Sequence, residues 1–229
     1  MGNYIGHSSF LSGANHWPRL VELLERHAID CVFDVGANVG QYARALRKNG
    51  YDGRIVSFEP LTSAHAELTR SAANEGTWIV AARTAVGASA GETRINISPE
   101  SDMSSILPLD VKARERLAST RSTETETVPV TTLSDALEAH AGSSAKIFVK
   151  SDTQGYENEV LSGIGDSWSR ITGIQLELSL QPIYEGQPDH LPLLDRLAAQ
   201  GLRPHLVIPG YWSRHYGRML EYDVVCFRD

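Results

Sequence analysis

Apolar positions along the chain follow two spacings, and their alternation predicts a series of strands and helices. Short apolar runs that are typical of buried strands occupy residues 31–35, 54–59 and 77–86. Apolar side chains recur at helical spacing over residues 18–28, 39–50 and 61–74. Strands that alternate with helices in this way predict a parallel sheet with right-handed crossovers.

The second half of the chain continues the alternation after a polar interruption. Residues 92–98 alternate apolar and polar side chains as a half-exposed strand does, and residues 99–127 are mostly polar. That polar stretch is either a mobile lid or a plain surface insertion. Further strands are predicted at residues 128–130, 146–150, 171–180, 202–208 and 222–227, and further helices at residues 133–139 and 191–200. We expect a single domain over residues 1–229, with a helical N-terminal extension over about residues 1–29.

The composition is ordinary for a globular protein, with 41% hydrophobic and 21% charged residues among 229. A formal net charge of -7 argues against a nucleic-acid partner, which needs a concentrated basic face. No run approaches the roughly 20 apolar residues of a membrane-spanning helix, so we expect no integral membrane segment. A small molecule or a glycan is the expected partner, and homo-oligomer formation stays open.

Both cysteines lie in apolar runs that read as strands. Cys31 opens the first predicted strand and Cys226 lies in the last one, which is how buried free thiols usually occur. Free thiols favour a reducing compartment. The sequence therefore predicts a cytoplasmic location.

The segment CVFDVGANVGQYARAL leaves a buried strand through a glycine-containing turn and enters a helix at once. A strand, a tight turn and a helix N-terminus together form a pocket of nucleotide size. Gly36 and Gly40 do not have the G-x-G-x-x-G spacing, which counts against NAD and an NAD-dependent oxidoreductase. Asn38 stands where a middle glycine often lies, and asparagine enters the left-handed region at low cost.

Two acids next to this turn suit an adenosyl ligand. Glu59 ends the second predicted strand, where its carboxylate can accept hydrogen bonds from both hydroxyls of a ribose; otherwise it is a solvated strand-end residue. Asp34 either organises the turn or holds the ammonium group of an amino-acid-like ligand. S-adenosylmethionine carries both a ribose and an aminocarboxylate.

Six segments add a resemblance to these observations. DVGANVGQY, SFEP, TAVG, MSSIL, VKSDTQGYENEVLSGI and DVVCF occur in this order between residues 31 and 227. In this order they resemble the FkbM family of S-adenosylmethionine-dependent methyltransferases. The resemblance implies an α/β fold of the Rossmann-like class I methyltransferase type: a seven-stranded, mostly parallel sheet with an antiparallel last strand and helices on both faces. It also implies methyl transfer to oxygen, often a hydroxyl of a sugar or of a polyketide-derived product.

The resemblance also implies roles for residues in these segments. The expected cofactor-binding residues are Asp34, Gly36, Ala37, Asn38, Gly40, Glu59, Ala85 and Asp152. Ser104 and Ser105 of MSSIL are expected to line the acceptor side. One departure stands out: the family usually has glutamate in a K-x-D-x-E-G pattern, whereas Gln154 occupies that position here. A catalytically silent nucleotide-binding module therefore stays open as an alternative.

Transfer to a hydroxyl needs a group that removes the proton, because an alcohol is a poor nucleophile. Asp152 is the leading candidate, since it follows a strand that is expected to end beside the first one. Glu177 lies between Leu176 and Leu178 and is expected to converge with Asp152 on the acceptor. The pair acts either directly, as base and orienting group, or through an oxygen-coordinated Mg²⁺; the alternative for each acid is a structural role.

The segment PGYWSRHYGRML offers a rival base and a binding surface. Because an imidazole side chain in general titrates near neutrality, His215 is the alternative proton acceptor. Tyr211, Trp212 and Arg214 form a mixture that suits a sugar, with aromatic faces on its apolar side and arginine on its hydroxyls. A packed loop with solvated arginines explains the same pattern. A carboxyl, phenol or nitrogen acceptor on a non-sugar metabolite also stays open.

Overall fold

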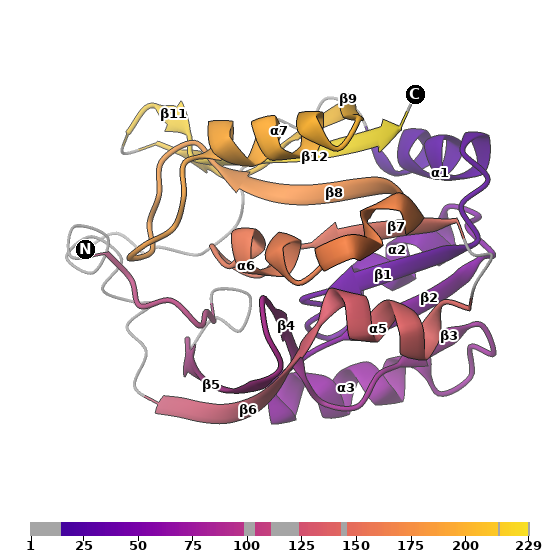
Figure 1. Ribbon diagram of the computed structural model, residues 1–229, viewed down its shortest axis with the longest axis horizontal. Helices are drawn as coiled ribbons and strands as arrows, with labels where there is room; N and C mark the ends of the chain where they lie inside the picture. Colours follow the sequence, from indigo (N-terminus) through magenta and orange to yellow (C-terminus); the bar gives the residue numbers. More distant parts are fainter. Residues whose placement is uncertain (1–14, 99–103, 111–123, 143–145, 215, 229) are drawn as a thin grey trace.

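The computed structural model describes residues 15–98, 104–110, 124–142, 146–214 and 216–228. Its centre is a seven-stranded sheet with the order β3-β2-β1-β7-β8-β12-β9 (Figure 1). The strands are β1 (Cys31–Val35), β2 (Arg54–Phe58), β3 (Trp78–Val80), β7 (Ile147–Ser151), β8 (Ile171–Ser179), β9 (Leu202–Pro209) and β12 (Glu221–Arg228). β12 runs antiparallel to both of its neighbours, β8 and β9. The five strands from β3 to β8 in the sheet order are all parallel to one another. The predicted sheet with an antiparallel last strand is confirmed.

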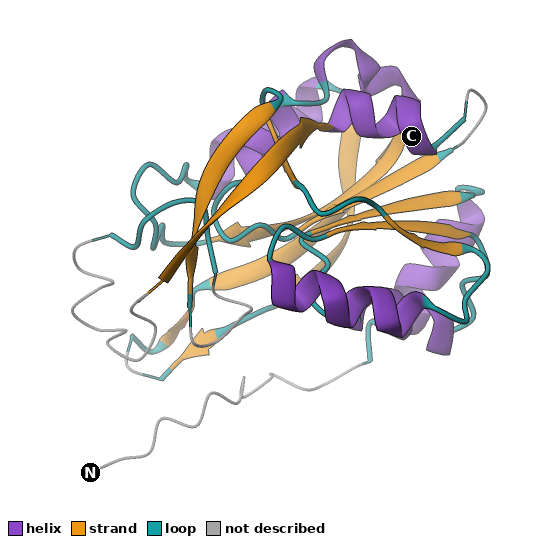
Figure 2. Cartoon of the chain, turned by 90° about the horizontal axis from the view of Figure 1, so that it is seen from below, coloured by secondary structure: helices purple, strands orange, loops and turns teal. Residues whose placement is uncertain are grey.

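Helices cover both faces of this sheet, as Figure 2 shows. They are α1 (Trp17–Arg26), α2 (Gln41–Lys48), α3 (Thr62–Ala72), α5 (Leu133–His140), α6 (Glu157–Ser162) and α7 (His190–Ala199), with a 3₁₀ helix at Gly165–Arg170. α1, α2 and α3 bury Leu20, Leu46 and Leu68 against one face. α5, α6 and α7 bury apolar side chains against the other. Because strand side chains alternate between faces, Asp34 of β1 points to the α2 side.

The predicted strand over residues 77–86 is wrong, because the chain divides there between two sheets. β3 pairs with β2 only as far as Val80, and β4 (Ala85–Gly87) joins a second sheet with the order β4-β6-β5. Between them, Arg83 donates to the carbonyl of Pro60 at 2.8 Å and to Glu126 at 2.9 Å. These bonds direct the chain away from β2 and toward β6.

The second sheet contains β5 (Gly91–Ile97) and β6 (Glu124–Thr132) as an antiparallel pair. β6 is longer than the predicted strand at residues 128–130 and begins inside the polar stretch of residues 99–127. Residues 99–103 and 111–123 of that stretch lie outside the described part. The lid therefore stays a prediction.

The second sheet stands at the edge toward which β7 and β8 point (Figure 1). A separate apolar cluster fixes it there, built on Leu61, Ala64, Ala85, Ile95 and Val128. A short hairpin of β10 (Trp212–Ser213) and β11 (Arg218–Met219) follows β9 near the same edge. The carboxyl ends of the parallel strands therefore face additional structure rather than open solvent. Among the described helices, none has the length and apolar character needed to cross a membrane.

Candidate active site

The turn that leaves β1, residues 36–40 (the first turn), is held by backbone hydrogen bonds. The N–H groups of Gly36 and Ala37 both donate to the carbonyl of Phe58, at 3.1 and 3.0 Å. Gly36, Asn38 and Gly40 adopt φ values of 76°, 47° and 86°, in the left-handed region. A Cβ atom on Gly36 would lie 1.9 Å from the carbonyl oxygen of Asp152. Only glycine therefore allows the first turn to reach the loop after β7.

Glu59 closes the first turn from β2. Its Oε2 accepts from the N–H of Asn38 at 2.9 Å, and its Oε1 accepts from the N–H of Leu61 at 2.8 Å. Burial raises the pKa of Glu59 to about 7, against the lowering effect of these two donors. Each carboxylate oxygen keeps a second lone pair for a ligand hydroxyl.

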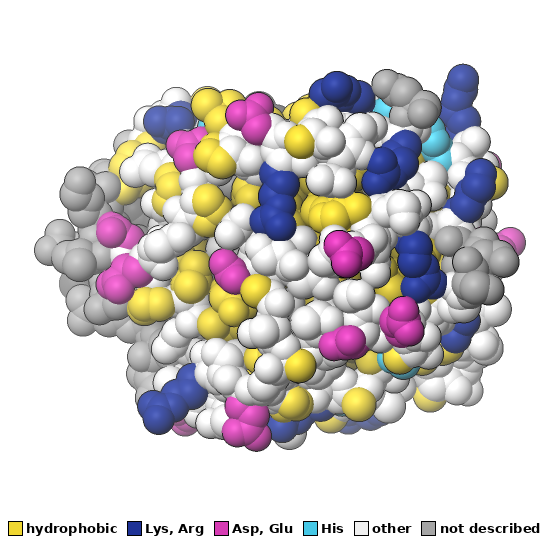
Figure 3. All heavy atoms as spheres, viewed as in Figure 1, with side chains coloured by type: hydrophobic (Ala, Val, Ile, Leu, Met, Phe, Trp, Pro, Cys, Tyr) yellow, Lys and Arg dark blue, Asp and Glu magenta, His cyan; other side chains and the backbone are white. Residues whose placement is uncertain are grey.

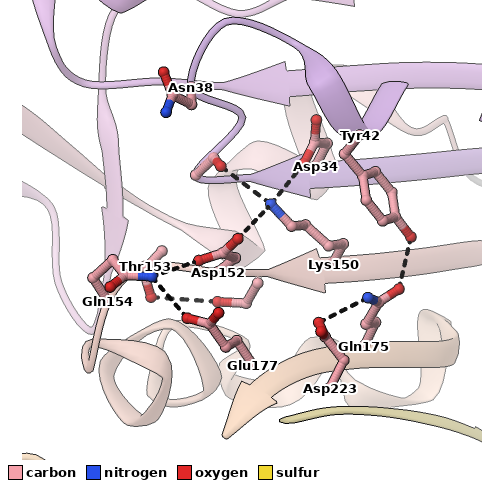
Figure 4. A network of polar contacts seen from close by, with 12 residues as sticks. Asp34, Asn38, Tyr42, Lys150, Asp152, Thr153, Gln154, Gln175, Glu177 and Asp223 are labelled. Atoms are coloured by element: carbon pink, nitrogen blue, oxygen red, sulfur yellow. Dashed lines mark hydrogen bonds and ion pairs between the residues drawn. The ribbon is translucent and has the colours of Figure 1, made fainter. Parts of the chain in front are cut away.

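Lys150 of β7 is a buried cation at the centre of the site (Figure 4). Its Nζ lies 3.3 Å from Asp34 Oδ1 and 3.5 Å from Asp152 Oδ2, and it donates to the carbonyl of Gly36 at 3.1 Å. Burial by itself lowers the pKa of Lys150, but the charges of Asp34 and Asp152 outweigh it and raise the pKa above its ordinary value. Lys150 thus joins the first turn to the loop after β7.

Asp34 lies beneath the first turn and is fully buried. Its Oδ2 accepts from the hydroxyl of Ser57 at 3.3 Å, and its other oxygen faces Lys150. Asp34 is connected to the turn through Lys150, and both of its predicted roles stay predictions. Lys150 was not among the predicted site residues. The feature of the sequence that could have identified it is a charged residue within a strand that is otherwise apolar up to that position.

The loop after β7, residues 152–155 (the second turn), is held by a side chain that the sequence analysis missed. Glu157 Oε1 accepts from Thr153 N at 2.9 Å, from Thr153 Oγ1 at 3.0 Å and from Gly155 N at 3.3 Å. Burial raises the pKa of Glu157 to about 7. Ser105 Oγ donates to the carbonyl of Gln154 at 2.6 Å from the opposite side.

The Gln154 side chain lies between the two candidate catalytic acids (Figure 4). Its Nε2 donates to Asp152 Oδ1 at 3.0 Å and to Glu177 Oε2 at 2.7 Å. Its Oε1 accepts from the hydroxyl of Tyr184 at 3.1 Å. The structure thus brings Asp152 and Glu177 to the same amide group.

Glu177 faces other acids on the sheet. Glu177 of β8 pairs in register with Asp223 of β12. The Asp223 carboxylate accepts a hydrogen bond from the Gln175 amide at 2.9 Å. Burial, followed by the charge of Asp152, raises the pKa of Glu177 well above its ordinary value. Burial raises the pKa of Asp223 to about 6. Glu177 therefore retains its proton more readily than an exposed glutamate does.

These elements surround a pocket of about 680 Å³, open mouth included. Seven predicted site residues line it: Gly36, Asn38, Glu59, Ala85, Ser104, Ser105 and Asp152. Within the described part of the chain, Asp34, Ala37, Gly40 and Glu177 do not line it and instead support its walls. The predicted acceptor residues of the β10–β11 hairpin, Tyr211, Trp212 and Arg214, are not among the residues that line this pocket. His215 is not among the residues that the structure describes.

A sequence profile described as the methyltransferase FkbM domain matches residues 34–204, which include both turns, Glu59 and Lys150. The chain belongs to the FkbM methyltransferase family. Residues 34–204 therefore form a methyltransferase domain. No curated protein matches the sequence.

Solved structures share the fold of this FkbM methyltransferase at low sequence identity. One titled METTL16 MTase domain has a TM-score of 0.50 at 11% identity, covering 92% of this chain and 66% of that one. An S-adenosylmethionine-dependent methyltransferase from Aquifex aeolicus has a TM-score of 0.45 at 14% identity, with 93% and 89% covered. Fibrillarin from Aeropyrum pernix with natively bound S-adenosyl-L-methionine has a TM-score of 0.46 at 9% identity, with 86% and 66% covered. The chain spans just under two thirds of the METTL16 and fibrillarin chains.

Two features around the pocket of the FkbM methyltransferase have the chemistry to hold S-adenosylmethionine. Glu59 has lone pairs that can accept from a ribose. Gly40 is the N-cap of α2, which has no side-chain cap and no acid in its first turn. Uncapped helix N–H groups suit a carboxylate such as that of the donor's methionine part. Gln41, the first residue of α2, lines the pocket.

Magnesium does not fit the site in the same way. Among the described residues of the FkbM methyltransferase, no group of at least three His, Cys, Asp or Glu side chains is arranged to hold a metal ion. Asp152 and Glu177 both accept hydrogen bonds from the Gln154 amide nitrogen, which stands between them. We therefore assign no step to a metal.

Proposed function

We propose that the chain is an S-adenosylmethionine-dependent O-methyltransferase that acts on a hydroxyl of a sugar, a glycosylated natural product or a glycolipid. The observation that carries the proposal is the position of Asp152. Its carboxylate is partly exposed at the pocket wall, at the carboxyl end of β7, and is held by Lys150 on one side and Gln154 on the other. A fixed carboxylate at this place can take the proton of an alcohol.

The first turn and its partners would bind the donor, which supplies an electrophilic methyl group on a sulfonium. Gly36, Ala37, Asn38 and Gly40 shape the backbone around it, Glu59 accepts from the ribose, and Ala85 contacts the adenine side. Asp34 keeps Lys150 beneath the turn. The donor's charge faces a wall that contains Asp152 rather than a free cation, because Lys150 is already paired.

Transfer is an in-line displacement on the methyl carbon. The acceptor oxygen forms a bond to that carbon while the carbon–sulfur bond breaks, and the hydroxyl proton passes to Asp152. Alignment of the three reacting atoms supplies much of the acceleration. Glu177 orients Asp152 through Gln154. His215 remains the alternative proton acceptor.

Acceptor binding is assigned to the side of the pocket away from Glu59. Ser104 and Ser105 line the pocket, and Ser105 donates to the carbonyl of Gln154 in the second turn. Tyr211, which is 44% exposed, and the half-buried Trp212 offer aromatic surface at the hairpin, with Arg214 beside them. Aromatic faces next to arginine suit a sugar ring.

Nucleic acid is the acceptor class that charge disfavours. The titles of some solved structures with this fold name RNA methylation, as for the putative RNA methyltransferase from Pyrococcus horikoshii. This chain has a net charge of -7, and on the face drawn in Figure 3 Lys and Arg are scattered among Asp and Glu. The absence of a nucleic-acid partner stays a prediction. A cytoplasmic location is inferred from Cys31 and Cys226, which are buried free thiols.

The test is methyl transfer from donor labelled in its methyl group. Parallel reactions contain glycosides, phenols, carboxylic acids, amines or RNA, each with and without a chelator, and product mass locates the label. We expect label on a sugar hydroxyl, with the chelator making no difference. Label on another acceptor would replace the sugar. Tight donor binding without transfer to any acceptor would indicate a silent binding module.

A further inference from the structure

Gln154 occupies its position under strain that its surroundings enforce. Its φ of 53° lies in the left-handed region, which costs a residue other than glycine, asparagine or aspartate about 1 kcal/mol or more. Its carbonyl accepts from Ser105, and the N–H groups of Thr153 and Gly155 on either side are bound by Glu157. The backbone of the second turn is therefore fixed independently of the Gln154 side chain.

The orientation of the Gln154 amide is determined by its three partners. Both N–H bonds point to carboxylate oxygens, at 3.0 Å from Asp152 and 2.7 Å from Glu177. The amide oxygen faces the hydroxyl of Tyr184, which can donate. Exchange of the amide oxygen and nitrogen would place the oxygen against the Asp152 carboxylate, which is paired with Lys150, so the orientation with nitrogen toward Asp152 is favoured.

The amide nitrogen lies between two acids, at the distances that a third ligand atom of a shared cation would have from the other two. Adjacent oxygen ligands of an octahedral Mg²⁺, with metal–oxygen distances of about 2.1 Å, lie about 3 Å apart. The distances from Gln154 Nε2 to the two acids match that spacing. An oxygen atom in place of this nitrogen would add a third carboxylate at ligand spacing from the other two.

Asp152 also has a positive partner already. Lys150 lies 3.5 Å from Asp152 Oδ2, while Gln154 binds Oδ1, so each oxygen of the carboxylate has one donor from the protein. The remaining lone pairs are available to the pocket, which Asp152 lines. Neither orientation nor charge compensation of Asp152 requires a divalent ion.

We propose that Gln154 is a positioning residue that orients the two acids without a metal ion: its amide binds Asp152 and Glu177 together and aims the Asp152 carboxylate at the acceptor. The catalytic role of Asp152 rests on the proposed function. The absence of a metal ion between Asp152 and Glu177 is inferred only from the hydrogen bonds of the Gln154 amide to these two acids. A hydrogen-bond donor with two N–H groups thus does the orienting that a divalent cation does between paired carboxylates elsewhere.

The test measures the binding of Mn²⁺ alone, which takes the same octahedral oxygen sites as Mg²⁺. Binding is monitored by the loss of the electron paramagnetic resonance signal of the free ion. The unaltered protein is expected to bind none up to about 1 mM. Gln154→Glu is expected to gain a site with at least about tenfold higher affinity, and Gln154→Glu with Glu177→Gln to lose it. Gln41→Glu, which adds a carboxylate elsewhere in the same pocket, is the matched control and is expected to behave like the unaltered protein.

Two results would overturn the proposal. The first is Mn²⁺ binding by the unaltered protein that Glu177→Gln abolishes, a measurement that needs no folded Gln154 variant. The second is a Gln154→Glu protein that binds S-adenosylhomocysteine normally but gains no Mn²⁺ site. Neither depends on methyl transfer, so the outcome is separate from that of the acceptor experiment. Gln154→Leu, which keeps the side-chain bulk, is then expected to lower kcat at least about tenfold while the KM for the donor is unchanged.

Discussion

The two turns at the carboxyl ends of β1 and β7 are built differently, although they touch. The first turn is closed mostly by backbone groups, with Gly36 and Ala37 both donating to Phe58, and Glu59 adds one carboxylate that accepts from Asn38. The second turn is closed by side chains: Glu157 from α6 beneath it, and Ser105 from the side of the second sheet. Both contain left-handed residues, but only the first has its glycine pressed against another backbone.

This difference separates binding from chemistry. A turn made mostly of backbone groups presents a fixed shape, and residues 36–40 themselves carry no charge. A turn held by carboxylates and an amide carries ionisable groups into the pocket, and these can move a proton. Substitutions in the first turn should therefore damage folding and donor binding, whereas substitutions in the second should damage turnover.

The largest effect is expected from Gly36→Ala. Its Cβ would meet the carbonyl oxygen of Asp152 at 1.9 Å, and its φ of 76° is unfavourable for alanine. We expect a loss of about 3 kcal/mol or more in the free energy of unfolding, and no measurable donor binding by calorimetry. Gly50→Ala is the control, because φ there is 99° but nothing lies within 4 Å, and it should cost about 1 kcal/mol. Equal losses for the two variants would contradict the contact between the turns.

Asp152→Asn should leave the fold intact and lower turnover by a factor of about 10² to 10⁴, the usual contribution of a general base. Turnover is measured with labelled donor, and donor affinity is measured separately by calorimetry. Asp166→Asn, at an exposed carboxylate in the 3₁₀ helix, is the control. Near-normal turnover of Asp152→Asn would remove this residue from the chemistry.

Glu59→Gln tests the donor side and should weaken affinity for S-adenosylhomocysteine by about 10- to 100-fold, as expected for hydrogen bonds to a charged acceptor. Burial raises the pKa of Glu59 to about 7, so the ionised form increases as the pH rises through that value. Affinity of the unaltered protein should therefore increase from about pH 6 to about pH 8. The variant should bind equally at both values, and an affinity of the unaltered protein that falls with pH would refute the assignment.

The smallest effect is expected from Gly155→Ala in the second turn. A Cβ there would lie 2.9 Å from the ring of Tyr184, which can move, whereas a backbone carbonyl cannot. We expect a loss of about 1 to 2 kcal/mol in the free energy of unfolding, measured with denaturant, and little change in donor affinity. Gly186→Ala, with φ of 79° and nothing within 4 Å, provides the comparison. A loss as large as that of Gly36→Ala would remove the distinction between the turns.

Much of the site was predictable because its parts lie at strand ends. In a parallel sheet, strands that alternate with helices bring their carboxyl ends to one edge, so Asp34, Glu59 and Asp152 had to lie near one another. Glu177 was expected there because a carboxyl group between two leucines needs a polar partner. The register of β1 with β2 and β7 confirms the strand neighbours on which that reasoning depended.

Other parts could not be read from the pattern. The split between β3 and β4 depends on the bonds of Arg83 to Pro60 and Glu126, which are distant in sequence. Glu157 looked like an ordinary glutamate at the start of a helix, yet it holds three donors of the second turn. Such roles depend on which groups are left without water, and periodicity carries no information about that.

The sequence alone determined the alternation of strands and helices, the glycine turn after β1 and the family, because each depends on residues that are close along the chain. Only the tertiary structure decided that Asp34 lies beneath the turn, that Lys150 joins the two turns and that the Gln154 amide stands between Asp152 and Glu177. The reason is physical: a buried polar group is satisfied by whichever partner folding brings within hydrogen-bond distance. That partner can come from any strand of the sheet.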